Sequence, residues 1–288
     1  MSGSIAVVVV SRNRLAQLCQ TLPRHLDDPA QPRVVLVDDA STDGTPEAVR
    51  RRFPAVEVIT LPVPRGAVAR NVGLRSVAEP YVAFCDDDAW FEPGSLGRAA
   101  ALLDGQPRLA VVNPRILVGS DRQVDPVCEE MARSPLPAAP QQPGHPLLSF
   151  IACAVVVRRD AALQVGGFCE RFQTGAEEKL LGWDLAAAGW QLSYVPELVA
   201  RHCPPGHDGR PRRRAQTLRN ELWTNWLRRS PAGAVRATVR ELRGSPLDTV
   251  TLRGIAEAAG GAGWVISRRR RCPAIVEQWI SLLEEGAG

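Results

Sequence analysis

The chain has 288 residues, of which 45% are hydrophobic and 23% charged, and its formal net charge is +4. This composition is ordinary for a globular protein with a large core, and the charge is too small to predict a nucleic-acid partner. No apolar run approaches a membrane span, and the first residues lack the basic segment of a secretory signal. Seven cysteines without a C-x-x-C pair favour reduced thiols, so we expect a cytoplasmic protein.

Strands and helices alternate through the first half of the sequence. Apolar, largely β-branched runs predict strands at 5–10, 34–37, 56–61, 81–85 and 109–112. The intervening segments predict helices, the first capped by Asn13 and the second by Thr45 with Pro46 in its first turn. Further helices are expected at 66–77 and 93–103. Repeated units of this kind predict an α/β fold with a mainly parallel, doubly wound sheet and helices on both faces.

The second half is less regular. Residues 119–146 are rich in Pro, Gln, Ala and Gly, and a connection of that length predicts a functional loop or a lid. A strand at 150–157, helices at 159–165 and 177–188, and a strand at 191–195 follow. Beyond residue 210 the sequence is mostly helical and rich in Arg and Trp. We therefore predict one α/β domain over residues 1–209 and a helical C-terminal extension over 210–288.

A triplet of carboxylates, Asp86, Asp87 and Asp88, follows the strand predicted at 81–85. Three like charges repel one another, but together they become favourable around a divalent cation, which prefers oxygen ligands. Ligands of an α/β sheet bind beyond the carboxyl ends of its strands. The triplet therefore predicts a Mg²⁺ or Mn²⁺ site that meets a phosphorylated ligand.

Three further polar clusters lie at or near predicted strand ends. Asp38 and Asp39 close the second strand and offer acceptors to a ribose or a base. Arg65-Gly66 and Arg70-Asn71 combine a glycine that permits close approach with an arginine that can pair with phosphate. Glu177 and Glu178 begin a helix, where acidic residues also simply favour the helix dipole, and His202 follows a later strand. Near a metal, such a carboxylate can take a proton from an incoming hydroxyl.

Several common nucleotide and hydrolase sites are excluded. A Walker A loop needs Gly-Lys-Ser/Thr, and the only lysine, Lys179, follows a glutamate. The first strand continues as Ser11-Arg12-Asn13-Arg14, without the G-x-G-x-x-G of dinucleotide-binding folds. The G-x-S-x-G turn of serine hydrolases is also missing. The acidic clusters are therefore the strongest functional signal.

In this order, the clusters resemble the family 2 glycosyltransferases, which have the GT-A fold. The likeness covers residues 5 to about 202. Val37 to Thr45 is similar to the family's nucleotide-binding signature, and Arg65 to Gly73 to its glycine-arginine-asparagine segment. Asp86-Asp87-Asp88 resembles its D-x-D metal motif, and Gly166-Gly167-Phe168 followed by Glu177-Glu178 resembles its acceptor-side segment with the catalytic acid pair.

The resemblance implies an inverting transfer of a sugar from a nucleoside diphosphate sugar, with a UDP-sugar as first choice, to a hydroxyl acceptor. It implies a nucleotide-binding half at 1–118 and an acceptor half at 119–209. The implied metal ligands are Asp86, Asp88 and His202, with Mg²⁺ or Mn²⁺ as cofactor. The implied nucleotide contacts are Ser11, Arg12, Asp38, Asp39, Arg65, Arg70, Asn71 and Asp87.

Three acidic residues are candidates for the catalytic base. Counting back from Gly189 aligns Glu178 with the family's catalytic Asp, so Glu178 is the first choice, beside Glu177. The residues that follow depart from the family pattern, which leaves Asp184 as a third candidate.

Alternatives remain for the reaction and for the partners. A nucleotidyltransferase of similar fold and a non-catalytic nucleotide-sugar-binding protein both fit the acidic clusters. The acceptor could be a polysaccharide, a lipid-linked molecule or a small glycoside. Trp223, Trp226 and Leu227 beside Arg219, Arg228 and Arg229 fit a helix on anionic lipid at the inner membrane face, or a helix packed on the catalytic domain. We favour the packed helix.

Overall fold

A computed structural model describes residues 4–204 and 210–286 of the chain. The predicted domain boundary at residue 209 lies outside these described residues. Within them, no helix is both long and apolar enough to cross a lipid bilayer.

The strands of the described residues form one ten-stranded sheet. Four parallel strands make up one side, in the order β3 (Glu57–Thr60), β2 (Arg33–Asp38), β1 (Ile5–Ser11) and β4 (Tyr81–Asp86). The other side continues with β9 (Ala154–Arg158), β6 (Leu109–Val118), β10 (Gln191–His202) and β5 (Ala89–Phe91). The short β7 (Gln123–Val124) and β8 (His145–Pro146) pair with β6 and β10.

The sheet is mixed, which corrects the mainly parallel sheet predicted from the sequence. β9 is antiparallel to both neighbours, β4 and β6, and β5 is antiparallel to β10. The error arose because an apolar run such as Ala154 to Val157 reads alike in a parallel strand and in any strand buried on both faces. The run does not encode its direction.

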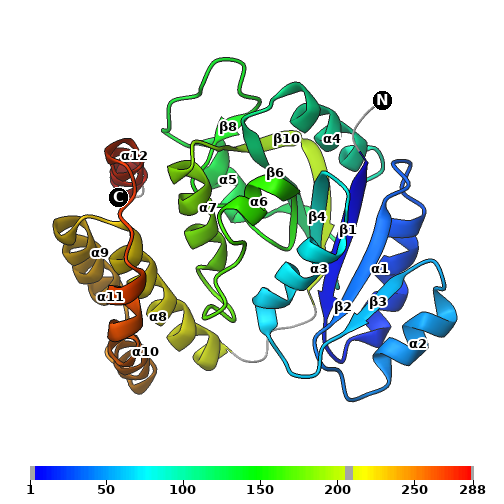
Figure 1. Cartoon of the computed structure of the whole chain (residues 1–288), viewed down its shortest axis with the longest axis horizontal. Helices are drawn as coiled ribbons and strands as arrows, with labels where there is room; N and C mark the ends of the chain where they lie inside the picture. Colours follow the sequence, from blue (N-terminus) through cyan, green and yellow to red (C-terminus); the bar gives the residue numbers. More distant parts are fainter. Residues whose placement is uncertain (1–3, 205–209, 287–288) are drawn as a thin grey trace.

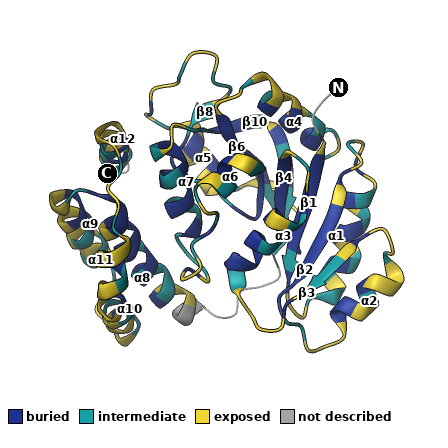
Figure 2. Cartoon of the chain, viewed as in Figure 1, coloured by how far each residue is buried: buried dark blue, intermediate teal, exposed yellow. Residues whose placement is uncertain are grey.

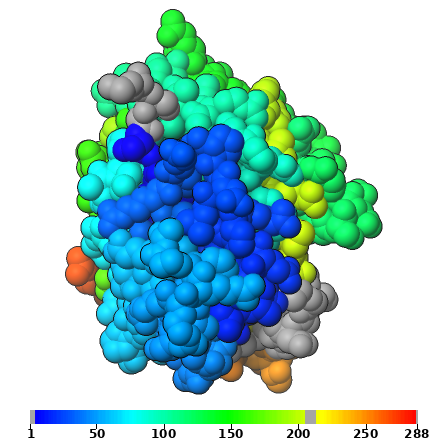
Figure 3. Space-filling model, turned by 90° about the vertical axis from the view of Figure 1, so that its right-hand side faces the viewer, coloured from blue at the N-terminus to red at the C-terminus, as the bar shows by residue number. Residues whose placement is uncertain are grey.

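Helices cover both faces of the sheet (Figure 1). Alternate residues of β1 belong to two separate hydrophobic cores, with Ala6 and Val8 in one and Ile5, Val7 and Val9 in the other. The first core is covered by α3 (Arg70–Ser76), α5 (Pro126–Ala132), α6 (Arg159–Gln164) and α7 (Glu177–Ala187). The second is covered by α1 (Leu15–Leu26), α2 (Thr45–Arg52) and α4 (Ser95–Gly105). Figure 2 shows the buried strands between these layers, and Figure 3 shows that β1 to α2 form much of the face opposite the C-terminal helices.

Two predicted helix caps are wrong. Asn13 has a left-handed backbone (φ 56°), and its side-chain oxygen accepts from the Thr42 N–H, so it ties two loops together. Helix α1 begins after Arg14. Gly44, with φ of 77°, precedes α2, which makes Thr45 the first helical residue rather than its cap.

The segment predicted as an irregular loop, 119–146, contains secondary structure. Asp125 caps helix α5 by accepting from the Val127 N–H, and Cys128 of that helix is fully buried. The proline that suggested a loop, Pro126, occupies the first turn of the helix, where its missing N–H costs nothing.

The C-terminal extension consists of α8 (Arg210–Arg228), α9 (Pro231–Gly244), α10 (Thr249–Gly260), α11 (Ala262–Arg268) and α12 (Ala274–Gly286). Helix α8 packs on the α/β domain through a cluster of Phe172, Leu180, Trp223, Leu227 and Val265. Asn220 of α8 donates to the carbonyls of Thr174 and Gly175, in the loop before α7. This is the packed arrangement of α8 that we favoured.

Candidate active site

Parallel pairing brings the ends of three strands together. Ser11, the last residue of β1, pairs with Asp38 at the end of β2, and Val10 pairs with Asp86 at the end of β4. The register of the sheet therefore gathers residues that lie up to 76 positions apart in the sequence. These are the strand ends at which α/β proteins bind ligands.

The three carboxylates of the triplet have different environments. Asp87 points inward: it accepts a hydrogen bond of 2.7 Å from the Ser11 hydroxyl and lies 3.3 Å from Arg14. Burial raises the pKa of Asp87 to about 6, although Ser11 and Arg14 oppose the rise. Asp86 and Asp88 instead meet His202, which ends β10, and one ligand atom from each of the three lies within 4.8 Å of the others.

A divalent cation fits this group of Asp86, Asp88 and His202. Oδ1 of Asp88 is buried and accepts no hydrogen bond of good geometry from the part of the chain that the structure describes, and Nε2 of His202 lies 3.3 Å from it. Burial lowers the pKa of His202, but Asp88 and Asp86 outweigh that effect and raise it. Two carboxylates and an imidazole are a suitable donor set for Mn²⁺ or Mg²⁺. A cation there would compete with a proton for the imidazole nitrogen of His202.

Two arginines balance the negative charge of the triplet. Arg70 of α3 is buried and donates to Asp86 over 2.6 Å, while its other terminal nitrogen lies 4.0 Å from Glu177. Arg14 reaches both Asp87 and Asp88, the latter at 3.0 Å. Sequence reasoning included Arg70 but missed Arg14. Its position three residues after Ser11, in the same strand-end loop, was the available signal.

Glu177 and Glu178 lie at the first turn of α7, across Arg70 from the triplet. Glu177 is buried, and its Oε2 has no hydrogen-bond partner among the described residues. Burial raises the pKa of Glu178 to about 7, the charge of Glu177 adds to the rise, and Arg70 opposes it. A carboxylate with a pKa near neutrality suits a general base, because it is both substantially ionised and basic at the working pH.

Asp184, the third candidate for the base, is excluded by its contacts. Both of its carboxylate oxygens accept from Arg228 of α8, at 2.5 and 2.9 Å, and only 11% of its side chain is exposed. Lys179 likewise turns away from the site, to Glu221 at 2.5 Å. Both pairs hold the C-terminal helices against α7.

The predicted nucleotide residues differ in how far the protein itself already engages their polar atoms. Arg12 and Arg65 are exposed near the strand ends. Oδ1 of Asp38 is buried and has no hydrogen-bond partner within residues 4–204 and 210–286. Asp39 accepts from the backbone N–H groups of Arg65 and Gly66, at 2.6 and 2.9 Å. Its side chain therefore orders the loop between β3 and α3.

Asn71 has an architectural role in place of the predicted nucleotide contact. Its side-chain nitrogen donates to the Phe168 carbonyl and its oxygen accepts from the Phe168 N–H, at 2.7 and 2.9 Å. It is 1% exposed, so no polar group of its side chain faces the strand ends. The sequence signature that includes Asn71 thus encodes packing as well as binding.

A polar cavity of about 330 Å³ adjoins Asp88 on the α1 side of the triplet. Arg24 stacks on the Trp90 ring at 4.2 Å, and Arg201 lies 5.8 Å from the same ring. Gln17 and Gln20 line the cavity as well. It provides space and hydrogen-bond donors next to the carboxylates.

Comparison with known proteins identifies the family. The sequence model described as Glycosyl transferase family 2 matches residues 6–166. An N-acetylglucosaminyl-diphospho-decaprenol L-rhamnosyltransferase from Mycobacterium tuberculosis is 30% identical over 213 residues, which cover 62% of this chain and 68% of the relative. The chain belongs to glycosyl transferase family 2. This family 2 glycosyltransferase is also 32% identical, over 182 residues, to a pre-mycofactocin glycosyltransferase of M. tuberculosis, covering 59% of the chain and 37% of that relative.

Solved structures agree on the GT-A fold of the family 2 glycosyltransferase. The mannosyltransferase PcManGT from Pyrobaculum calidifontis, in complex with GDP-Man and Mn²⁺, has a TM-score of 0.61 at 20% identity and is covered over 85% of its chain. TarS 1–349 from S. aureus, in complex with UDP-GlcNAc, has a TM-score of 0.62 at 18% identity and is covered over 83% of its chain. The two matches span 99% and 96% of this chain. The predicted family, fold and glycosyl transfer are confirmed, and the nucleotidyltransferase alternative is set aside.

Proposed function

We propose that this glycosyltransferase uses a divalent cation, Mg²⁺ or Mn²⁺, held by Asp86, Asp88 and His202, and transfers its sugar with inversion. A cation bound there would neutralise the charge that develops on the departing diphosphate. Glu178 takes the proton of the acceptor hydroxyl as that oxygen attacks the anomeric carbon. Arg70 lies between Asp86 and Glu177 and so links the proposed metal ligands to the start of the helix that carries Glu178.

The observation that carries this proposal is the meeting of Asp86, Asp88 and His202 at one point. They come from β4, from the turn after it and from the end of β10, 116 positions further along the chain. Such a donor set, with a buried carboxylate oxygen that lacks a hydrogen bond, is what a hard cation needs. The relatives of similar fold that were solved with Mn²⁺ add support.

The proposed donor is a nucleoside diphosphate sugar, with a UDP-sugar as first choice. Ser11, Arg12, Asp38, Arg65 and Asp87 surround the strand ends where the nucleotide would lie. The proposed acceptor carries a hydroxyl and is a polysaccharide, a lipid-linked molecule or a small glycoside. The relative from M. tuberculosis is named for a diphospho-decaprenol acceptor, which favours the lipid-linked class.

A cytoplasmic location with peripheral membrane contact completes the proposal. Trp223 and Leu227 of α8 are buried, so the lipid contact that stood as the alternative for this segment would fall to the neighbouring helices. Val235 and Val239 of α9 are 50% and 41% exposed, beside the exposed Arg236 and Arg243. Aliphatic residues between arginines suit an anionic lipid surface. Flotation with anionic and neutral liposomes, at low and high salt, tests this contact.

Titration calorimetry with UDP tests the metal and donor site. We expect Mn²⁺ to strengthen UDP binding to the wild type, and Asp88→Asn to remove most of that gain. Asp160→Asn is the matched control, because the side chain of Asp160 is 87% exposed and far from the strand ends in the fold. UDP affinity that is the same with and without Mn²⁺ in the wild type would contradict the proposed metal site.

A further inference from the structure

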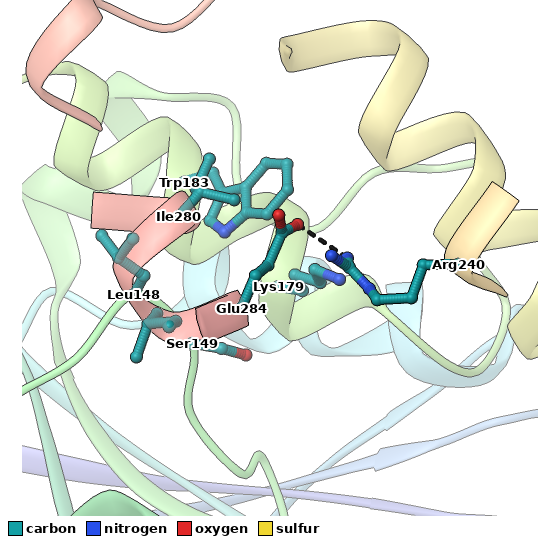
Figure 4. Close-up of a pocket in the computed structure, with 8 residues that line it drawn as sticks. Leu148, Ser149, Lys179, Trp183, Arg240, Ile280 and Glu284 are labelled. Carbon is teal, nitrogen blue, oxygen red and sulfur yellow. Dashed lines mark hydrogen bonds and ion pairs between the residues drawn. The ribbon is translucent and has the colours of Figure 1, made fainter. Parts of the chain in front are cut away.

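A cavity of about 330 Å³ lies at the seam between the α/β domain and the C-terminal helices. One wall comes from Leu148 and Ser149 and from Lys179 and Trp183 of α7 (Figure 4). The opposite wall comes from Arg240 of α9 and from α12, through Ile280, Leu283 and Glu284. None of these residues belongs to the nucleotide or metal site, so the cavity is a second site with its own chemistry.

The interior of this cavity is apolar and its rim is charged. Leu148, Trp183 and Ile280 are each 2–3% exposed and form one hydrophobic cluster with their neighbours. The rim charges are already paired: Lys179 with Glu221 at 2.5 Å, and Arg240 with Glu284 at 2.6 Å (Figure 4). Because both cations have an acid partner, the cavity offers an apolar ligand contact area without selecting for an anion.

The cavity and the proposed base share helix α7. Lys179 and Trp183, one helical turn apart, face the cavity, whereas Glu178 contacts the backbone of Ala152. The chain from Ser149 to Ala152 connects the two sites and spans at most about 10 Å. Gly182 permits this close packing, because an added Cβ would lie 2.2 Å from the Leu148 carbonyl oxygen. The proposed base and the cavity therefore lie on one helix and adjoin opposite ends of one short segment, which places them about 10 Å apart at most.

We propose that this cavity binds the apolar part of the acceptor, and that the acceptor is an amphiphile with an aliphatic chain attached to its hydroxyl-bearing head. The proposal deepens the glycosyl transfer proposed above and rests on Glu178 as the base. The helices that line the cavity also carry exposed aliphatic side chains, Val239 on α9 and Leu282 on α12, which suit contact with a lipid surface. The volume of about 330 Å³ holds roughly eleven methylene-sized groups at about 30 Å³ each.

A series of n-alkyl β-glucosides, used below their micelle-forming concentrations, tests the proposal by titration calorimetry. We expect affinity to rise about fourfold per added methylene, the factor that corresponds to burial of one such group, and to level off near eleven carbons. Unspecific adsorption to exposed aliphatic surface has no such limit. An absent chain-length dependence, or a rise without a plateau, would overturn the proposal.

Matched variants locate the binding. Leu283→Trp fills the cavity and should abolish the chain-length dependence, whereas Leu282→Trp, on the neighbouring 39% exposed residue, should preserve it. Ser149→Phe fills the cavity from the opposite wall and checks that the loss does not come from misfolded α12. An unchanged dependence in both filling variants would refute the assignment.

Hydrolysis of UDP-sugars with Mn²⁺, measured on the same proteins, separates this proposal from the proposed function. Donor hydrolysis should be the same in Leu283→Trp, Ser149→Phe and the wild type. If the wild type hydrolyses the donor but its alkyl glucoside binding does not depend on chain length, only the proposal of an amphiphilic acceptor is refuted. If binding depends on chain length but the donor is not hydrolysed, the proposed metal-dependent transfer is refuted and the apolar binding site is still supported.

Discussion

Acidification from pH 8 to pH 6 should slow glycosyl transfer about tenfold through the protonation of Glu178. Its pKa is raised to about 7, so about nine-tenths of the group is ionised at pH 8 and about one-tenth at pH 6. Only the ionised carboxylate can accept the acceptor's proton, so the rate rises with pH and levels off above the pKa. The acidic limb of the profile should have a slope of one.

Glu177→Gln should move that acidic limb to lower pH. The causes of the raised pKa of Glu178 are burial first and the negative charge of Glu177 second. Glutamine retains the shape of the side chain and removes the charge, so Glu178 then ionises more readily. The variant should therefore be more active than the wild type at pH 6, relative to the rate of each at pH 8.

The assay is UDP release under saturating donor, acceptor and Mn²⁺, so that the profile reports the bound enzyme. Glu178→Gln should lose about 10²- to 10⁴-fold in rate, the usual contribution of a general base, and its residual rate should no longer follow this limb. The assignment of the base would be refuted if the acidic limb persisted in Glu178→Gln. It would also be refuted if the midpoint pH of that limb were the same in Glu177→Gln as in the wild type.

Three further results are expected. His202→Ala should weaken Mn²⁺ binding at least roughly tenfold. In the wild type, Mn²⁺ affinity should fall as the pH drops through the raised pKa of His202, and the variant should lose this pH dependence. Calorimetry in buffers of different protonation enthalpy measures both effects. Asp184→Ala leaves the buried Arg228 unpaired and should cost about 3–5 kcal/mol in the free energy of unfolding, most of it regained with Arg228→Met, as measured by urea denaturation. Gly182→Ala places a methyl group 2.2 Å from a carbonyl oxygen and should destabilise the fold by about 1–3 kcal/mol, whereas Gly97→Ala, in a helix with open space, should stabilise it slightly.

The sequence predicted those parts of the site that depend on strand ends. Apolar, β-branched runs in the sequence located β1, β2 and β4. The parallel pairing of these strands is enough to bring Ser11, Asp38 and Asp86 together. His202 was placed after a strand, and the structure extends that strand to His202 itself. Predictions of this kind succeed because strand ends and the edge at which they meet are set by local pattern and sheet topology.

The sequence did not predict pairs that depend on how separate elements pack. Asp184 looked like a candidate base because an acidic residue in α7 has the same sequence appearance whether it faces a substrate or Arg228. Arg14 was overlooked because its partners are 73 and 74 positions away. The polar groups of Asn71 belong to the Phe168 backbone, which no spacing rule reveals. Such contacts require the tertiary structure.

The nucleotide side and the acceptor side of the site are joined by backbone contacts. Asp39 holds the Arg65 and Gly66 amides, and the next amide, that of Ala67, donates to the Gln173 carbonyl in the loop before α7. A Cβ on Gly66 would lie 2.5 Å from that same carbonyl oxygen, so only glycine permits the contact. The loop after β3 and the loop that leads into α7, where Glu178 lies, are therefore in direct backbone contact. The glycine of the family signature sets the distance between the proposed metal site and the proposed base, because it lets two segments 107 residues apart touch through their backbones.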